Sequence, residues 1–200
     1  MLSLRSCLLA IAAAGIGLTA PTASAQGTIT DIVAESGGEF DKDRRDYDIL
    51  LNAVVTAGLA EVLADPDAEF TVFAPKDSAF VRLAKDLGYK GRYDEEAVFN
   101  YIVGVLTKLG GGDPIPVLTD ILLYHVVPGT VRPIDLILST IFASPIETAL
   151  PGGKIQPFFL RLIDNDPDFK DPFVTFPLNI RATNGRIHTI TRVLIPVDLP

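Results

Sequence analysis

Apolar residues at helical spacing dominate the first two thirds of the chain. Between residues 46 and 65 they recur at steps of three and four, and Gly58 permits a bend before Pro66 ends the pattern. The same spacing over residues 94–109 predicts a second long amphipathic helix, which three successive glycines close. Shorter helices are predicted over residues 77–87, 117–123 and 133–138.

Acidic residues stand where several of these helices are expected to begin. Asp46 or Asp48 is placed to cap the first helix, and Asp77 is placed to cap the next, because a carboxylate accepts the free amides of a first turn. Residues 41–46 mix acidic and basic side chains, which is typical of a solvated loop before a helix.

Residues of β-branched and aromatic type concentrate towards the end of the chain. Strands are predicted over residues 69–74, 154–163 and 173–176. Asn184-Gly185 separates two further β-rich runs and predicts a hairpin, because both residues tolerate a positive φ. Helices therefore come early and most strands late, an order that favours an α+β fold over repeated βαβ units.

The composition is that of an acidic globular domain. Among 200 residues, 25 are Asp or Glu and 17 are Lys or Arg, which gives a formal net charge of −8. This balance argues against a nucleic-acid partner, because phosphate binding needs a positive field. The single Cys cannot form an internal disulfide, and we expect no cofactor.

The first 25 residues have the pattern of a cleavable export signal. Arg5 precedes an apolar run that ends at Leu18, and Ala23-Ser24-Ala25 provides small residues for cleavage. The alternative is an N-terminal membrane anchor, but the run is short for a span. We therefore expect a secreted protein, periplasmic or extracellular, whose residues 26–200 form one cysteine-free domain without a further membrane span.

Three segments, taken together and in this order, resemble the fasciclin (FAS1) domain family. They are FTVFAPKDSAF at residues 70–80, LLYHVVPG at residues 122–129, and ATNGRIH at residues 182–188 with VLIP at residues 193–196. The resemblance covers residues 28–196. It implies a β-wedge or sandwich of about seven strands flanked by helices, with one helix layer against a mostly antiparallel sheet.

The resemblance also implies a function in adhesion. Members of the family are secreted or surface-attached, take part in cell adhesion and matrix contact, and are not generally enzymes. Some animal members have an Asp-Ile pair implicated in integrin contact, and Asn179-Ile180 occupies the corresponding positions here. Residues 89–116 form a longer connection than the family pattern leads us to expect, and could form a lid or partner surface.

Tyr124 and His125 are the first candidate site. As a surface pair they would suit partner recognition, because Tyr offers a large apolar face and a polar tip. The alternative is that His125, inside an apolar run, is buried and ties its strand to a neighbouring loop. Together with Asn179 and Ile180, the pair forms the predicted partner-binding set.

Metal-site patterns are weak in this chain. His125 and His188 would need a carboxylate as third ligand, and no local spacing supplies one. Residues 164–171 form an acidic loop with oxygen ligands at alternate positions, but Phe169 and Thr175 replace the Gly and Glu that a calcium loop needs. A solvated turn is the expectation for this loop.

No motif for nucleophilic, metalloprotease or phosphate chemistry occurs. We therefore predict a non-catalytic, exported fasciclin-type domain that binds a cell-surface, envelope or matrix protein or polysaccharide. The alternative is a small-ligand-binding protein or hydrolase with a groove beside the helix at residues 94–109. That groove would use some of the late aromatic residues, which are otherwise expected in the core: Phe158, Phe159, Phe169 and Phe173.

Overall fold

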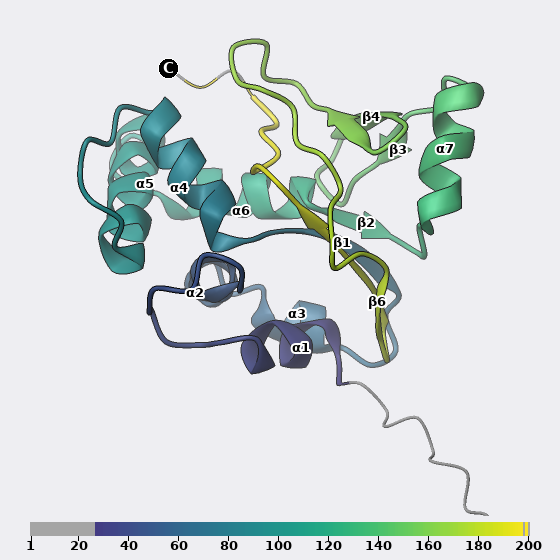
Figure 1. Ribbon diagram of the computed structural model, residues 1–200, viewed down its shortest axis with the longest axis horizontal. Helices are drawn as coiled ribbons and strands as arrows, with labels where there is room; N and C mark the ends of the chain where they lie inside the picture. The colour runs from purple at the N-terminus through teal and green to yellow at the C-terminus, as the bar shows by residue number, and fades with distance from the viewer. Residues whose placement is uncertain (1–26, 198, 200) are drawn as a thin grey trace, which may run out of the picture.

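The computed structural model describes residues 27–197 and 199, so the predicted export signal lies outside the described residues (Figure 1). The helices are α1 (Ile29–Glu35), α2 (Asp48–Thr56), α3 (Ala60–Ala64), α4 (Asp77–Asp86), α5 (Glu95–Leu109), α6 (Ile115–Tyr124) and α7 (Pro133–Ile141). The strands are β1 (Phe70–Pro75), β2 (Val126–Pro128), β3 (Ile146–Glu147), β4 (Lys154–Phe158), β5 (Arg161–Ile163), β6 (Ile180–Ala182) and β7 (Gly185–Ile190). The α+β class, with seven strands among the described residues, is confirmed.

The strands form two sheets. One has four strands in the order β2-β1-β7-β6, and the other has three antiparallel strands in the order β3-β4-β5. In the larger sheet the central pair, β1 and β7, is parallel, with Phe73 opposite His188. The expectation of a mostly antiparallel sheet holds for the outer pairs and not for this one. Parallel pairing is accessible here because most of the chain connects the two strands.

The larger sheet separates two hydrophobic cores. Val72 and Ala74 of β1 face a core built mainly by α1 to α6, whereas Phe73 faces a second core that includes Tyr124 and residues of β4 and β5. This alternation follows from the twofold repeat of a strand. Both faces of β1 are covered, so its residues are apolar except Thr71, whose buried hydroxyl donates to the Gly129 carbonyl at 2.7 Å.

Two regions therefore flank the four-stranded sheet (Figure 1). We call α1 to α6 the helical half, and α7 with the β3-β4-β5 sheet the β half. In Figure 1 the helical half lies to the left of and below β1, and α7 stands at the opposite side beside β3 and β4. Within the described residues, no helix has the length and apolar content that a membrane crossing requires.

The predicted helices are present, but their caps differ from the expectation. Asp94 caps α5 by accepting a hydrogen bond from the Ala97 amide at 2.8 Å. Neither Asp46 nor Asp48 caps α2 with its side chain. Instead the Asp77 carboxylate, from the first turn of α4, accepts hydrogen bonds from the first amides of α2 at 3.0 and 3.3 Å. The cap comes from another helix because α2 and α4 begin side by side. This proximity in space cannot be predicted from spacing along the sequence.

The predicted hairpin at Asn184 is also present. Ala182 pairs with Gly185, and any Cβ at Gly185 would collide with the backbone oxygen of Phe70. The Asn184 side chain reaches α1 and α3: it accepts a hydrogen bond from the Ile29 amide and donates one to the carbonyl of Leu63. Asn184 therefore joins the C-terminal hairpin to the N-terminal helices α1 and α3, a role beyond the turn that the sequence predicted.

Two strand predictions need correction. Residues 154–163 form the β4–β5 hairpin and not one strand, with Phe158 opposite Arg161. Residues 173–176 form no strand and make only isolated bridges, among them that of Phe173 with Arg161. The Phe173 amide donates instead to the Thr191 hydroxyl at 3.0 Å. A continuous run of β-favouring residues cannot show where the chain reverses without a Gly or Asn.

Candidate functional site

Tyr124 and His125, the first predicted pair, lie inside the domain. The exposed fraction is 0% for Tyr124 and 2% for His125. The Tyr124 hydroxyl donates a hydrogen bond to the Lys154 carbonyl at 2.6 Å, which ties the end of α6 to β4. Neither side chain is accessible to solvent. The position of His125 therefore agrees with the alternative in which this histidine is buried. That the pair contacts a partner stays a prediction.

His125 connects the end of α6 to the C-terminal segment through its ring. Nδ1 lies 2.8 Å from the Ile121 carbonyl oxygen, and Nε2 accepts a hydrogen bond from the Leu194 amide at 2.9 Å. These contacts assign the proton to Nδ1. Burial lowers the pKa of His125 to about 4, so the ring is neutral at physiological pH. A neutral ring with both nitrogens engaged is a structural connector.

His188 is engaged in the same way and lies apart from His125. Its Nε2 is 2.8 Å from the Val131 carbonyl oxygen, its Nδ1 accepts from the Asn179 amide at 3.3 Å, and its ring stacks on Phe73. Burial lowers its pKa as well. The structure does not bring the two rings together as ligands, because each ring nitrogen already has a backbone partner.

Asn179 and Ile180, the second predicted pair, lie at the edge of the larger sheet. Both are half-buried, and Ile180 begins the edge strand β6. Asn179 has a φ of +59°, which an Asn tolerates, and its side-chain oxygen accepts a hydrogen bond from Arg186 at 2.7 Å. These residues remain accessible at the surface, unlike the Tyr-His pair.

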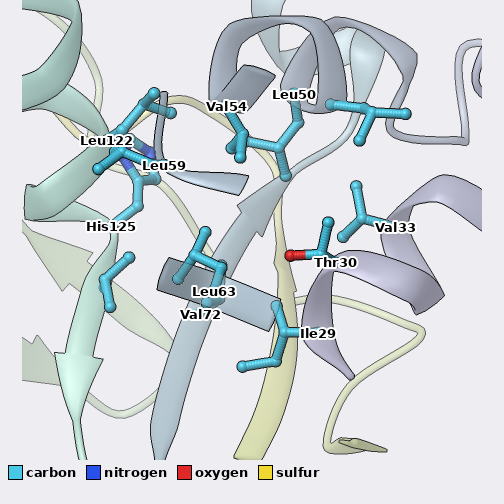
Figure 2. A pocket seen from close by; sticks show the side chains of 12 residues that line it. Ile29, Thr30, Val33, Leu50, Val54, Leu59, Leu63, Val72, Leu122 and His125 are labelled. Carbon is cyan, nitrogen blue, oxygen red and sulfur yellow. The ribbon is translucent and has the colours of Figure 1, made fainter. Parts of the chain in front are cut away.

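A small apolar cavity lies in the helical half (Figure 2). Figure 2 shows side chains of α1, α2, α3 and β1 around it, with Leu122 and His125 closing the side opposite α1. It has space for about 20 Å³ of water-sized contents, which is roughly one water molecule. No residue of α5 lines it.

This cavity offers no group for chemistry. Its lining is apolar apart from Thr30 and His125, and the Thr30 hydroxyl already donates to the Ala60 carbonyl at 3.1 Å. A groove beside α5, the alternative from the sequence, finds no support in this cavity. Within α5, Val98, Ile102 and Leu106 pack into the core of the helical half, so this inserted helix is a core element.

Two carboxylates of the acidic loop at residues 164–171 accept hydrogen bonds from backbone amides. Asp166, which is buried, accepts hydrogen bonds from the Asp168, Phe169 and Leu199 amides. Asp164 accepts from the Ile195 amide at 2.9 Å, and burial raises its pKa to about 6. The expectation of a solvated turn is wrong for these two carboxylates, because they fasten the C-terminal segment to the domain.

An exposed apolar surface surrounds the tip of the β4–β5 hairpin, where the sequence predicted core. Phe158, Phe159 and Phe173 are each more than half exposed, and they line an open hollow of about 410 Å³ with Leu160 and Arg161. We call these five residues the hairpin-tip face. The rings of Phe158 and Phe159 meet edge to face, with centroids 5.3 Å apart. Clustered exposed aromatic residues are typical of binding surfaces.

The hairpin tip is strained at one of these residues. Phe159 has a φ of +56°, a conformation that glycine and asparagine adopt easily and that bulky residues avoid. The Phe159 amide donates to the Thr140 hydroxyl at 2.6 Å, which fixes the turn against α7. A residue suited to the turn would cost less, so folding alone does not explain an exposed Phe here. No periodicity in the sequence indicates this feature.

Sequence comparison identifies a family. The family model of the fasciclin domain matches residues 45–196. Among curated proteins, the uncharacterized protein sll1735 of Synechocystis sp. (strain PCC 6803) is 34% identical over 152 residues, which covers 74% of this chain and 89% of that protein. Fasciclin domains are generally adhesion or interaction modules and are generally non-catalytic.

Structure comparison agrees on the fold. The chain is similar to a solved FAS1 domain pair from the insect cell adhesion molecule fasciclin I, with a TM-score of 0.52 and 16% identity. The match covers 84% of this chain and 51% of the solved chain, so this chain spans about half the length of that domain pair. The three motifs, the two sheets and both comparisons lead to one conclusion: the chain belongs to the fasciclin (FAS1) domain family.

Proposed function

We propose that this protein is an exported, non-catalytic FAS1 interaction domain that binds a cell-surface, envelope or matrix protein, or a polysaccharide, through its hairpin-tip face. The observation that carries the proposal is the exposure of Phe158, Phe159 and Phe173 around one turn. Aromatic side chains lose little conformational entropy on binding and dominate the energetics of many interfaces.

The neighbourhood of the face supports this assignment. Arg161 lies within it and pairs with Asp171, so a charged group borders the apolar area. Ile141 and Phe142 follow Thr140, which is bonded to the hairpin tip, and both are exposed. The apolar surface therefore continues onto the end of α7. An aromatic centre with a polar rim is the composition expected of an interface.

A protein partner is favoured over a polysaccharide by the mixture of side chains. The face consists of Phe, Leu and Arg side chains. They offer mainly apolar area, and the Arg161 guanidinium is their one group for directional hydrogen bonding. Polysaccharides present many hydroxyls, which require polar partners when buried. Asn179 and Ile180, at the edge of the larger sheet, are candidate additional contacts.

Export is part of the proposal and rests on residues 1–25 of the sequence. The pattern of Arg5, an apolar run and Ala23-Ser24-Ala25 supports it. N-terminal sequencing of the protein recovered outside the cytoplasm is expected to begin at Gln26. Recovery of a cytoplasmic protein that retains residues 1–25 would contradict export.

The binding proposal is tested with a surface variant. In Phe158→Ser/Phe173→Ser the two rings are removed from positions that contribute little to the core, so the melting temperature is expected to stay within a few degrees. Both proteins, immobilised at equal density, are exposed to envelope proteins and, separately, to exopolysaccharide from the source organism. We expect saturable protein binding that falls at least tenfold in the variant.

The matched control is Val55→Ser, which removes an equally exposed apolar side chain from α2 in the helical half. It is expected to bind like the unmodified protein. Equal binding by all three proteins would contradict the role of the hairpin-tip face. Binding of polysaccharide alone would overturn the protein partner, and turnover of a bound glycan would overturn the non-catalytic assignment.

A further inference from the structure

Three helices of the helical half begin at the same place, and each brings a carboxylate there. Asp48, Asp77 and Glu95 lie in the first turns of α2, α4 and α5, and each is at most 1% exposed. Asp41 and Asp46, from the segment before α2, join them. We call these five residues the carboxylate cluster.

The oxygens of the cluster are close enough to share one ion. Carboxylate oxygens of Asp46, Asp77 and Glu95 lie within 4.8 Å of one another, and those of Asp41, Asp46 and Asp48 form a second such group. Asp46 belongs to both groups. Two oxygens that bind one Ca²⁺ at 2.3–2.6 Å can be at most about 5 Å apart, so either group fits around a single ion.

Backbone and tyrosine donors hold part of the cluster in place. The Asp41 amide and the Tyr93 hydroxyl each donate to a different oxygen of Glu95. The Gly38 amide donates to Oδ1 of Asp48. These contacts fix the side chains without neutralising their charges.

Two oxygens in the cluster have nothing to bind. Oδ2 of Asp48 and Oδ1 of Asp46 are buried and have no hydrogen-bond partner among the described residues. Asp48 is 0% exposed, so its free oxygen has no access to bulk water. A buried, unpartnered carboxylate oxygen is costly, and an ion that coordinates it removes that cost.

The described residues supply no cationic partner. Five ion pairs occur among residues 27–197, and none of them includes a member of the cluster. Arg45, which directly precedes Asp46, pairs with Asp43, and Arg44 places its guanidinium over the Tyr93 ring at 4.0 Å. Burial is the main cause that raises the pKa of Asp77, and the neighbouring Asp46 raises it further. This is expected where carboxylates lie close together without a counter-charge.

We propose that the carboxylate cluster is a calcium site. Asp46, Asp77 and Glu95 bind one Ca²⁺, and Asp41 and Asp48, which share Asp46 with that group, provide further carboxylate oxygens on the side of the ion that faces solvent. An all-oxygen ligand set selects hard cations, and several carboxylates with spacings up to 4.8 Å suit Ca²⁺. Mg²⁺ binds at 2.0–2.1 Å and usually retains several waters, so this set fits it poorly. Asp41 is exposed and marks the route of entry.

The ion would join segments that otherwise repel one another. It contacts the loop before α2 and the beginnings of α4 and α5, which pack together in the helical half. Calcium binding is therefore expected to stabilise the whole domain. Extracellular modules bind Ca²⁺ with dissociation constants on the order of 10⁻⁴–10⁻³ M, and we expect this range or tighter.

Terbium luminescence tests the site, because a bound Tb³⁺ emits when a nearby tyrosine is excited and the chain has no Trp. Tb³⁺ is titrated into the EDTA-treated, purified protein, and Ca²⁺ is then added in competition. We expect saturable emission with one ion per chain, reversed by Ca²⁺ at least tenfold more effectively than by Mg²⁺. The melting temperature is expected to rise with Ca²⁺.

Matched variants locate the ion. Tyr93→Phe is expected to remove most of the emission, whereas Tyr101→Phe, whose hydroxyl donates to the Leu87 carbonyl, is expected to retain it. Asp46→Asn is expected to weaken Ca²⁺ binding at least tenfold in calorimetry. Asp168→Asn, in the acidic loop, is expected to leave it unchanged. Because wild-type binding is measured first, a variant that fails to fold does not decide the outcome.

Several results would overturn the proposal. These are the absence of saturable Tb³⁺ emission in the unmodified protein, emission that survives in Tyr93→Phe, and loss of binding in Asp168→Asn but not in Asp46→Asn. Equal competition by Mg²⁺ would overturn the choice of calcium. An unchanged melting temperature in Ca²⁺ would show that a shared proton, and not a cation, occupies the cluster.

Discussion

In the helical half of this domain five carboxylates lie together where α2, α4 and α5 begin, whereas in the β half three phenylalanines are exposed around one turn. Burial of charge and exposure of aromatic rings both cost free energy relative to the reverse arrangement. Each half thus departs from the burial preference in its own way. Such departures mark positions that the fold alone does not account for, and they point to different ligands.

The largest contrast is between a buried and an exposed ring. Phe73→Ala removes a ring with 0% exposure from the second core and is expected to lower the free energy of unfolding by about 3–5 kcal/mol. Phe176→Ala removes a ring that is 78% exposed, and is expected to change it by about 0.5 kcal/mol or less. Urea denaturation of both variants measures the difference. Similar losses would show that the exposed rings support the fold.

In the helical half, Asp77 separates the effects of hydrogen bonding and charge. Asp77→Ala leaves two amides of α2 without an acceptor and is expected to cost about 2 kcal/mol. Asp77→Asn keeps an acceptor and removes a charge from the carboxylate cluster, so we expect less than half that loss. If Asn cost as much as Ala in calcium-free buffer, the negative charge itself would be stabilising.

The dependence of stability on pH distinguishes the buried carboxylates from the buried histidine. Burial and neighbouring carboxylates raise the pKa of Asp77, Glu95 and Asp48, so their contribution is present at low pH and is lost as pH rises through the raised pKa values. Asp41, Asp46, Tyr93 and Arg44 are the titratable or charged groups that face them. In EDTA the melting temperature is expected to fall between pH 7 and pH 9, and Ca²⁺ is expected to reduce this fall.

His125 gives the opposite dependence on the acid side. Its pKa in the folded protein is about 4, against 6.5 for an unperturbed histidine, so the unfolded chain binds the proton more readily. Its contribution is present above pH 6.5 and is lost as pH falls towards 4. Between pH 4 and pH 6.5 its effect therefore opposes that of the carboxylates, whose contribution falls as pH rises. A melting temperature that rises steadily to pH 9 in EDTA would contradict the account of the cluster.

The smallest expected effect is at the strained turn of the β half. Phe159→Asn places a residue that tolerates positive φ at the tip of the β4–β5 hairpin. We expect the free energy of unfolding to rise by about 0.5–1 kcal/mol, while partner binding weakens. Thermal unfolding and a binding titration measure the two effects. Lower stability with unaltered binding would contradict a functional origin of the strain.

Much of the fold could be predicted from the sequence, because helix periodicity and the Asn184-Gly185 turn are local signals. The family motifs added the expectation of about seven strands flanked by helices, and the division into two sheets came from the structure. Local signals failed where a side chain serves a distant element: Asp77 caps α2 from another helix, and Asn184 bonds to residues on α1 and α3. Such contacts depend on tertiary packing, which spacing along the chain does not contain.

The candidate site was less predictable than the fold. The β-branched and aromatic residues at 154–163 predicted β structure, but they could not show that the rings of Phe158 and Phe159 would be exposed. Likewise Asp41 and Asp46 have the charge pattern of a solvated loop, and only the meeting of three helix ends brings their carboxylates next to Glu95. Burial of Tyr124 and His125 matched the less functional of the two interpretations.

The central claim is that this FAS1 domain makes its contact through the β half. The most direct test introduces a photo-crosslinking amino acid at Phe158 in one variant and at Val55 of α2, which is 59% exposed, in another. Each variant is irradiated with the envelope proteins of the source organism. The account predicts one discrete adduct from position 158 and none from position 55. An adduct from position 55 alone, or the same adducts from both positions, would contradict it.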